Sequence, residues 1–240
     1  MMAAPIPAPS SAAASSSRPA TTPITLPDGR TAELVSLGGG ASEPLLRRVA
    51  AELGPAADVV SHFWGQDWRR DITVVATGSN AQFSALAGGG ADIAAATTAD
   101  RILFAPGAAA MTDADLRLVV RHELFHFAAR EATAADAPRW LTEGVADYVA
   151  RPRTTAPADL VPALPTDADL DTAGVTRSQA YDRAWWFASY VADHYGEPAL
   201  RGLYLRACGP DHPDVATAVR ETLGADLDEV VAGWRHWQAS

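Results

Sequence analysis

Residues 122–126 read His-Glu-Leu-Phe-His, with two histidines four positions apart and a glutamate directly after the first. Residues four apart share one face of an α-helix, so the imidazoles of His122 and His126 can reach a single metal ion. Glu123 lies about 100° further around such a helix, beside the metal rather than bound to it. Its carboxylate can take a proton from a zinc-bound water, whose pKa falls to about 7. The spacing therefore predicts a hydrolytic site with one Zn²⁺ ion.

A catalytic zinc ion normally has three protein ligands and one open position, so the two histidines need a partner. No third histidine follows His126 within a short turn, because the next six residues read FAAREA. Glu143 lies after a short loop on the next predicted helix, and an antiparallel helix pair would bring it over both histidines. Asp147 follows four residues later on the same face. There it can accept a hydrogen bond from a metal-bound histidine and fix its orientation.

The remaining histidines and the single cysteine do not have the spacing of a metal site. His62, His212 and His236 stand alone in the sequence, and we assign them no role. Cys208 has no second cysteine with which to form a disulfide or a cysteine-based zinc site. We expect it to be a small buried or half-buried side chain.

Composition excludes several classes of function. The formal net charge of −10 argues against nucleic-acid binding and against attachment to anionic lipid. No stretch approaches the roughly 20 apolar residues that a membrane-spanning helix needs. With 48% hydrophobic residues, the chain has enough apolar side chains for a sizeable core. The oligomeric state cannot be read from these features.

The first 23 residues are rich in alanine, proline and serine, and we expect them to form a disordered tail. They have neither the basic segment nor the continuous apolar segment of a signal peptide. Their composition suits a tether behind an export signal or anchor, which favours a secreted or envelope-tethered protein. A cytoplasmic protein with a tail would explain the same residues. The folded domain is predicted to span residues 24–240.

The elements that must position the site fall into two parts, a sheet part at residues 24–111 and a helical part at 112–240. In the first part, Pro27-Asp28-Gly29 reads as a turn between two short strands. Runs rich in β-branched or apolar residues predict further strands at 71–77, 93–98 and 101–106. Helices are predicted at 42–54, ending at Gly54-Pro55, and at 57–64 and 80–87.

In the second part, Thr112 with Asp115 forms a capping-box-like start for a helix that carries the motif and reaches about Arg130. Pro138 suits the first turn of the next helix, which carries Glu143. Further along we expect a surface loop at 151–170 and three or four helices, at about 177–195, 198–207, 213–223 and 227–238.

The motif His-Glu-Leu-Phe-His, followed by Pro-Arg-Trp-Leu-Thr-Glu-Gly-Val-Ala-Asp-Tyr at 138–148, resembles the gluzincin zinc metallopeptidases. It is most similar to the small bacterial peptidase-MA-like domains, which pair H-E-x-x-H with W-L-x-E-G-x-A. The resemblance implies a zincin-like α+β fold, with a small mixed β-sheet, an active-site helix, a glutamate-ligand helix and a C-terminal helical subdomain. It also implies the roles of the matching residues: histidine ligands His122 and His126, general base Glu123, ligand Glu143 and, more loosely, supporting aspartate Asp147.

The resemblance covers about residues 70–238, although only the two metal-binding helices carry specific motifs. It implies that Tyr181 stabilises the oxyanion, with Tyr190, Tyr148 and His194 as alternatives. The edge strand of the family's sheet would bind an extended peptide by β-augmentation. Gly144, which costs about 1 kcal/mol against alanine in a helix, would permit a close helix–helix approach beside the metal.

The substrate implied is a peptide or protein. The G-x-M-E-N motif with which related aminopeptidases bind a free amine is absent, and Gly-Gly-Gly-Ala-Asp at 88–92 does not reproduce it. We therefore expect an endopeptidase. The alternative is a zinc-binding module of the same fold that is non-catalytic or latent. The intact Glu123 argues against a purely structural site, which needs no general base and is closed by four ligands.

Overall fold

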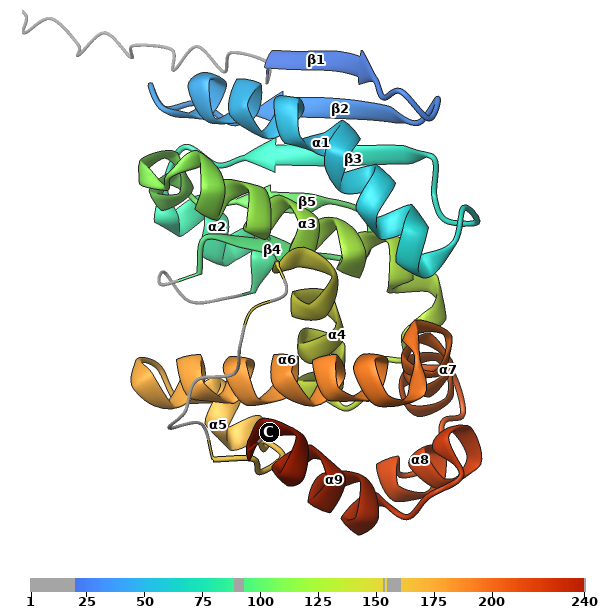
Figure 1. Ribbon diagram of the computed structural model, residues 1–240. Coiled ribbons are helices and arrows are strands. Elements are labelled where there is room, and N and C mark those ends of the chain that lie inside the picture. Colours follow the sequence, from blue (N-terminus) through green and yellow to red (C-terminus); the bar gives the residue numbers. More distant parts are fainter. Residues whose placement is uncertain (1–19, 89–92, 153, 155–160, 240) are drawn as a thin grey trace, which may run out of the picture.

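The computed structural model describes residues 20–88, 93–152, 154 and 161–239. The sheet lies at one end of the molecule, with helices α1 (Ser42–Trp64) and α3 (Asp113–Ala129) packed side by side on one of its faces (Figure 1). Helix α4 (Arg139–Ala150) leads away from the sheet to a second, helical part. The chain is thus a mixed α+β structure with a small sheet and a larger share of helix.

Five strands form the sheet in the order β1-β2-β3-β5-β4. β1 (Ala20–Thr25) is antiparallel to β2 (Thr31–Ser36). β3 (Asp71–Ala76) is parallel to both of its neighbours, β2 and β5 (Ile102–Phe104). β4 (Ala95–Thr97) runs antiparallel to β5 at the edge of the sheet. Residues 20–23, which the sequence analysis assigns to the tail, belong to β1 and pair with β2.

The two faces of the sheet are covered by different helices. Val74 and Ile102 point into the main core beneath α1 and α3. Val75 and Leu103, one residue further along each strand, point to the opposite face and pack with Phe83 of α2 (Asn80–Ala87). The alternation of side chains along a strand thus explains why both faces carry apolar residues.

Helix α1 is continuous where the sequence predicts two helices separated at Gly54-Pro55. Gly54 has no Cβ, so the usual clash between a proline ring and the preceding side chain is absent. Both halves of the helix also bury apolar residues in the same core, including Leu53 and Val60. This shared burial stabilises a helix through a proline that lacks the N–H for one intrahelical bond.

Helix α3 begins as the sequence predicts. The side chain of Thr112 accepts a hydrogen bond from the backbone N–H of Asp115 at 3.1 Å, which satisfies one of the free donors of the first turn. A short 3-10 helix, η1 (Pro106–Ala110), precedes α3, and another, η2 (Arg130–Ala132), follows it. Helix α4 then starts directly after Pro138.

The helical part consists of α6 (Val175–Tyr195), α7 (Glu197–Cys208), α8 (Val215–Leu223) and α9 (Leu227–Ala239). All four lie at the predicted positions to within two residues. The predicted loop at 151–170 differs in its last part, where α5 (Asp167–Asp171) forms with a capping box between Thr166 and Asp169. In the described part of the chain, no helix combines the length and apolar character of a membrane span.

Candidate metal centre

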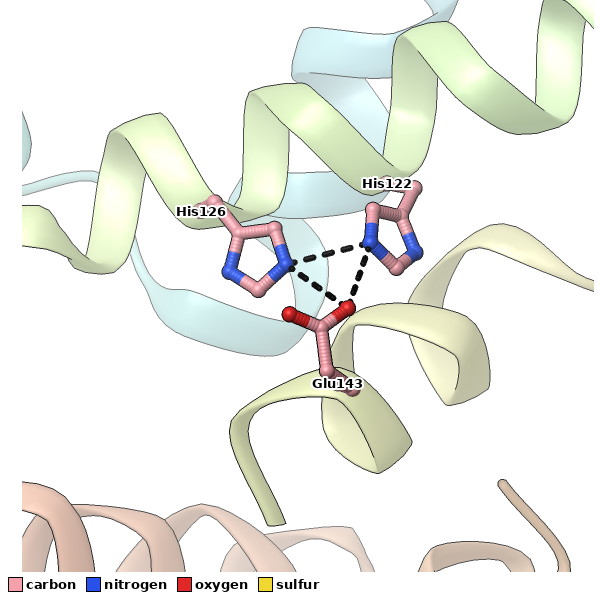
Figure 2. A group of neighbouring side chains, drawn as sticks. All are labelled: His122, His126 and Glu143. Carbon is pink, nitrogen blue, oxygen red and sulfur yellow. Dashed lines mark hydrogen bonds and ion pairs between the residues drawn. The ribbon is translucent and has the colours of Figure 1, made fainter. Parts of the chain in front are cut away.

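Two neighbouring helices carry the predicted ligands, and the structure brings all three together. His122 and His126 extend from α3 toward α4, and Glu143 extends from α4 toward them (Figure 2). Nε2 of His122 lies 3.1 Å from Oε2 of Glu143 and 3.1 Å from Nε2 of His126. Nε2 of His126 lies 3.5 Å from the same Glu143 oxygen.

The coordination geometry of zinc sets the distances expected between its donor atoms. Donor atoms about 2.0–2.1 Å from a tetrahedral zinc ion lie about 3.3 Å from one another. The three separations in the cluster bracket this value, and the donor set of two imidazoles and a carboxylate is one that zinc accepts. His122, His126 and Glu143 could therefore hold one zinc ion and leave a fourth position open.

Asp147 lies on the far side of His122 from the cluster. Its Oδ1 is 2.9 Å from Nδ1 of His122, and its side chain is buried, with 8% of its surface exposed. A proton on Nδ1 that is donated to this carboxylate leaves the lone pair of Nε2 directed at the metal position. The carboxylate of Asp147 thus lies within hydrogen-bonding distance of the His122 ring.

Arg151 extends this arrangement in a way that the sequence does not predict. One of its terminal nitrogens lies 2.7 Å from Oδ2 of Asp147, and the other donates to Asp182 of α6 at 2.8 Å. Its guanidinium carbon lies 4.7 Å from the ring centre of Trp185. The spacing of Asp147 and Arg151, four residues apart, is a signal that could have revealed the first contact. The contacts with α6 depend on tertiary packing.

The pKa values of the cluster shift in opposite directions. Burial acts to lower the pKa of His122, but hydrogen bonds with Asp147 and Glu143 outweigh it and raise that pKa well above its usual range. Burial acts to raise the pKa of Glu143, but the charge of His126 and hydrogen bonds with both histidines bring it well below its usual range. The site therefore favours positive charge between its carboxylates, which is what a bound cation supplies.

Glu123 faces the same cleft and is held by the edge strand of the sheet. Its side chain is 7% exposed, and Oγ1 of Thr97 lies 2.7 Å from its Oε2 and 2.9 Å from its backbone oxygen. Thr97 belongs to β4, so a short edge strand fixes the orientation of this carboxylate. Sequence reasoning missed Thr97, because nothing local indicates which strand residue meets α3.

Tyr181 of α6 lines the cleft together with Glu123, His126 and Glu143. Burial, followed by the charges of the nearby carboxylates, raises the pKa of its hydroxyl, so that this group remains a protonated donor.

The alternatives to Tyr181 lie elsewhere. Tyr148 donates a hydrogen bond to Glu197 at 2.7 Å, and Tyr190 stacks on His194 with ring centres 5.4 Å apart. None of these three alternatives is among the described residues that line the cleft around His126.

The cleft continues on both sides of the cluster. On the His126 side, a hollow of about 430 Å³ is bounded by β4, the C-terminal end of α3 and the start of α4. On the His122 side, a hollow of about 460 Å³ is largely apolar, with Met111, Val119 and Trp185 in its wall. Ala95 of β4 lines both, so the free edge of the sheet runs along the whole cleft.

The other residues singled out in the sequence have structural positions. Cys208 is fully buried, as predicted, and burial raises the pKa of its thiol to about 12. Within the described residues, His62, His212 and His236 belong to no metal-ligand cluster. Gly144 lies against α6, where a methyl group at its Cα would be 2.5 Å from the backbone oxygen of Ala184. The close helix–helix approach expected at this glycine is therefore present.

No protein-family model and no curated protein sequence matches the chain. Solved structures do. Aminopeptidase A of Legionella pneumophila, in complex with aspartic acid, matches with a TM-score of 0.59 at 13% identity, over 90% of this chain and 28% of that one. The M1 zinc metallopeptidase of Deinococcus radiodurans matches with a TM-score of 0.57 at 17% identity, over 92% of this chain and 51% of that one. A mutant of that enzyme bound to a Tyr-Ser-Ala substrate gives 0.56 at 18% identity, with the same coverage.

At these identities the likeness shows the fold. The chain shares the mixed α+β fold of M1 zinc metallopeptidase domains, and it spans about half or less of the length of these proteins.

Proposed function

We propose that this protein hydrolyses peptide bonds with one zinc ion held by His122, His126 and Glu143. The observation that carries the proposal is the convergence of three donor atoms, from two helices, at separations that suit zinc. The fold shared with zinc metallopeptidases supports it. When bound, zinc would polarise the scissile carbonyl and lower the pKa of a water molecule.

The surrounding residues have distinct tasks in this proposal. Glu123 accepts the proton of the attacking water and passes it to the leaving amine. Because Thr97 contacts only one carboxylate oxygen of Glu123, the other oxygen is available for the water. Tyr181 donates its hydroxyl to the developing oxyanion. Asp147 keeps the ring of His122 in its ligand orientation.

Two observations favour cleavage within a chain over removal of a terminal residue. The cleft is hollowed on both sides of the metal position, so that substrate can extend in both directions along β4. In the His126-side hollow, the described lining residues include no carboxylate besides Glu123 and Glu143 that could bind a free amine. The glycine-rich segment at 88–92, apart from Gly88, lies outside the described residues.

One of the structural neighbours is an aminopeptidase, so exopeptidase action is the alternative within the same chemistry. Matched peptides with free and acetylated N-termini separate the two. An endopeptidase cleaves both at similar internal positions, whereas an aminopeptidase releases single residues from the free form and leaves the acetylated form intact.

Zinc content and two substitutions test the core of the proposal. Native protein should contain about one equivalent of zinc, and His126→Ala should lose it. Glu123→Gln should keep the metal and lose cleavage of unfolded casein. A native protein without zinc, or a Glu123→Gln variant as active as wild type, would refute the proposal. Stoichiometric zinc without any cleavage by wild type would favour the non-catalytic or latent module.

A further inference from the structure

The hollow on the His126 side is lined by basic side chains, although the whole molecule is acidic. The chain carries a net charge of −10. Yet the described wall of this hollow contains two arginines, Arg130 and Arg139, and its only carboxylates are Glu123 and Glu143. Both carboxylates have tasks in the proposed zinc chemistry. What remains for substrate in this hollow is therefore positive charge.

The two arginines have regular positions relative to the metal ligands. Arg130 follows His126 by four residues at the end of α3, and Arg139 precedes Glu143 by four residues at the start of α4. Each is thus one helical turn, about 5–6 Å, from a ligand on the same side of its helix. A substrate group bound there would lie within about two residues of the scissile bond, given roughly 3.3 Å per extended residue.

The two guanidinium groups differ in their partners. Arg139 forms an ion pair with Asp171 at 2.9 Å. Arg130 is exposed, and no side chain in the described part of the chain forms an ion pair or hydrogen bond with it. The neighbouring hydroxyls of Thr133 and Tyr204 are 2.8 Å apart and bond each other, and Thr133 also donates to the backbone oxygen of Ala129 at 2.8 Å.

We propose, on the basis of the peptidase function above, that Arg130 binds a substrate carboxylate and selects peptides that carry one close to the scissile bond. The planar fork of a guanidinium matches a carboxylate with two parallel hydrogen bonds. The carboxylate can belong to an aspartate or glutamate side chain or to a free C-terminus. The hollow on the His122 side also has an arginine in its wall, Arg151, but its guanidinium is paired with Asp147 and Asp182.

Binding to an inactive protein tests this site without turnover. The protein is the full chain with Glu123→Gln, loaded with zinc, and the probes are dansyl-labelled hexapeptides of alanine and phenylalanine. In one arm a single glutamate is moved through an amidated peptide and compared with glutamine at the same place. In the other arm the C-terminus is free or amidated. Dissociation constants are measured by fluorescence titration.

At the preferred position, glutamate should bind about tenfold more tightly than glutamine, the effect of a charge-assisted hydrogen bond. If Arg130 binds the C-terminal carboxylate instead, amidation of the peptide should raise the dissociation constant by the same factor. Arg130→Glu should abolish or reverse the difference, and added salt should reduce it. Arg47→Glu is the matched control, because this substitution changes the net charge by the same amount. Arg47 lies beside a separate groove between α1 and the first strands.

Equal binding of charged and neutral peptides in both arms would overturn the proposal. A preference that survives Arg130→Glu would overturn it as well. Absence of cleavage by wild type, together with a preserved glutamate preference in these titrations, would refute the peptidase function while supporting the carboxylate site. The two failures can therefore be told apart.

Discussion

Gly144 follows Glu143 in α4 and lies in a close contact between α4 and α6, and Gly144→Ala provides a quantitative test of that contact. Two effects oppose each other. Alanine is about 1 kcal/mol more favourable than glycine inside a helix. However, the new methyl carbon would lie 2.5 Å from the oxygen and 2.7 Å from the carbon of the Ala184 carbonyl in α6. These are backbone atoms of a helix, which cannot rotate away as a side chain can.

The expected change in the free energy of unfolding follows from these two opposing effects. Overpacking of a core typically costs about 1–3 kcal/mol, and an obstacle of backbone atoms belongs at the upper end of that range. After the gain in helix propensity, we expect the free energy of unfolding to fall by about 2 kcal/mol. Because α4 must move away from α6, Glu143 also shifts relative to the histidines. We expect zinc affinity to fall by about tenfold, which is the effect of removing a residue that hydrogen-bonds to a metal ligand.

Urea unfolding of the zinc-free protein measures the first effect, and competition with a chelator measures the second. Gly202→Ala in α7 is the matched control, because its methyl would meet only a movable side-chain carbon of Thr222 at 3.3 Å. We expect that control to change stability by less than about 1 kcal/mol. A Gly144→Ala variant as stable as wild type, with unchanged zinc affinity, would refute the packing argument.

Three further outcomes are expected. Zinc binding at pH 7 should release a proton, and zinc affinity should rise with pH, because the pKa of metal-free His122 is raised and zinc needs the neutral ring. Calorimetry in buffers of different ionisation enthalpy measures the released proton. A binding enthalpy that does not depend on the buffer would contradict this prediction. Asp147→Asn should weaken zinc binding by about 10–100-fold, measured with the same chelator, whereas an unchanged affinity would remove its supporting role. Tyr181→Phe should lower kcat by about 10²–10³ with little change in KM, and an unaltered kcat in peptide assays would exclude it as the oxyanion donor.

The features of the site that arise from local geometry can be predicted from the order of residues. Helical periodicity places His122 and His126 on one face, and the hydrogen-bonding capacity of Thr112 starts the helix that carries them. Asp147 shares a helix face with Glu143 by the same spacing. These inferences depend on residues a few positions apart, whereas the prediction of Glu143 as a ligand also needed an antiparallel pair of helices.

Contacts between groups on different elements could not be predicted in this way. Burial of both halves of α1 overrides the break expected at Gly54-Pro55. Thr97 reaches Glu123 across 26 positions of sequence, and Arg151 reaches Asp182 across 31. Arg130 becomes a cleft residue only because the ends of α3 and α4 and strand β4 enclose the same hollow. Such contacts depend on how the helices and the sheet pack, and no local pattern of residue types encodes that arrangement.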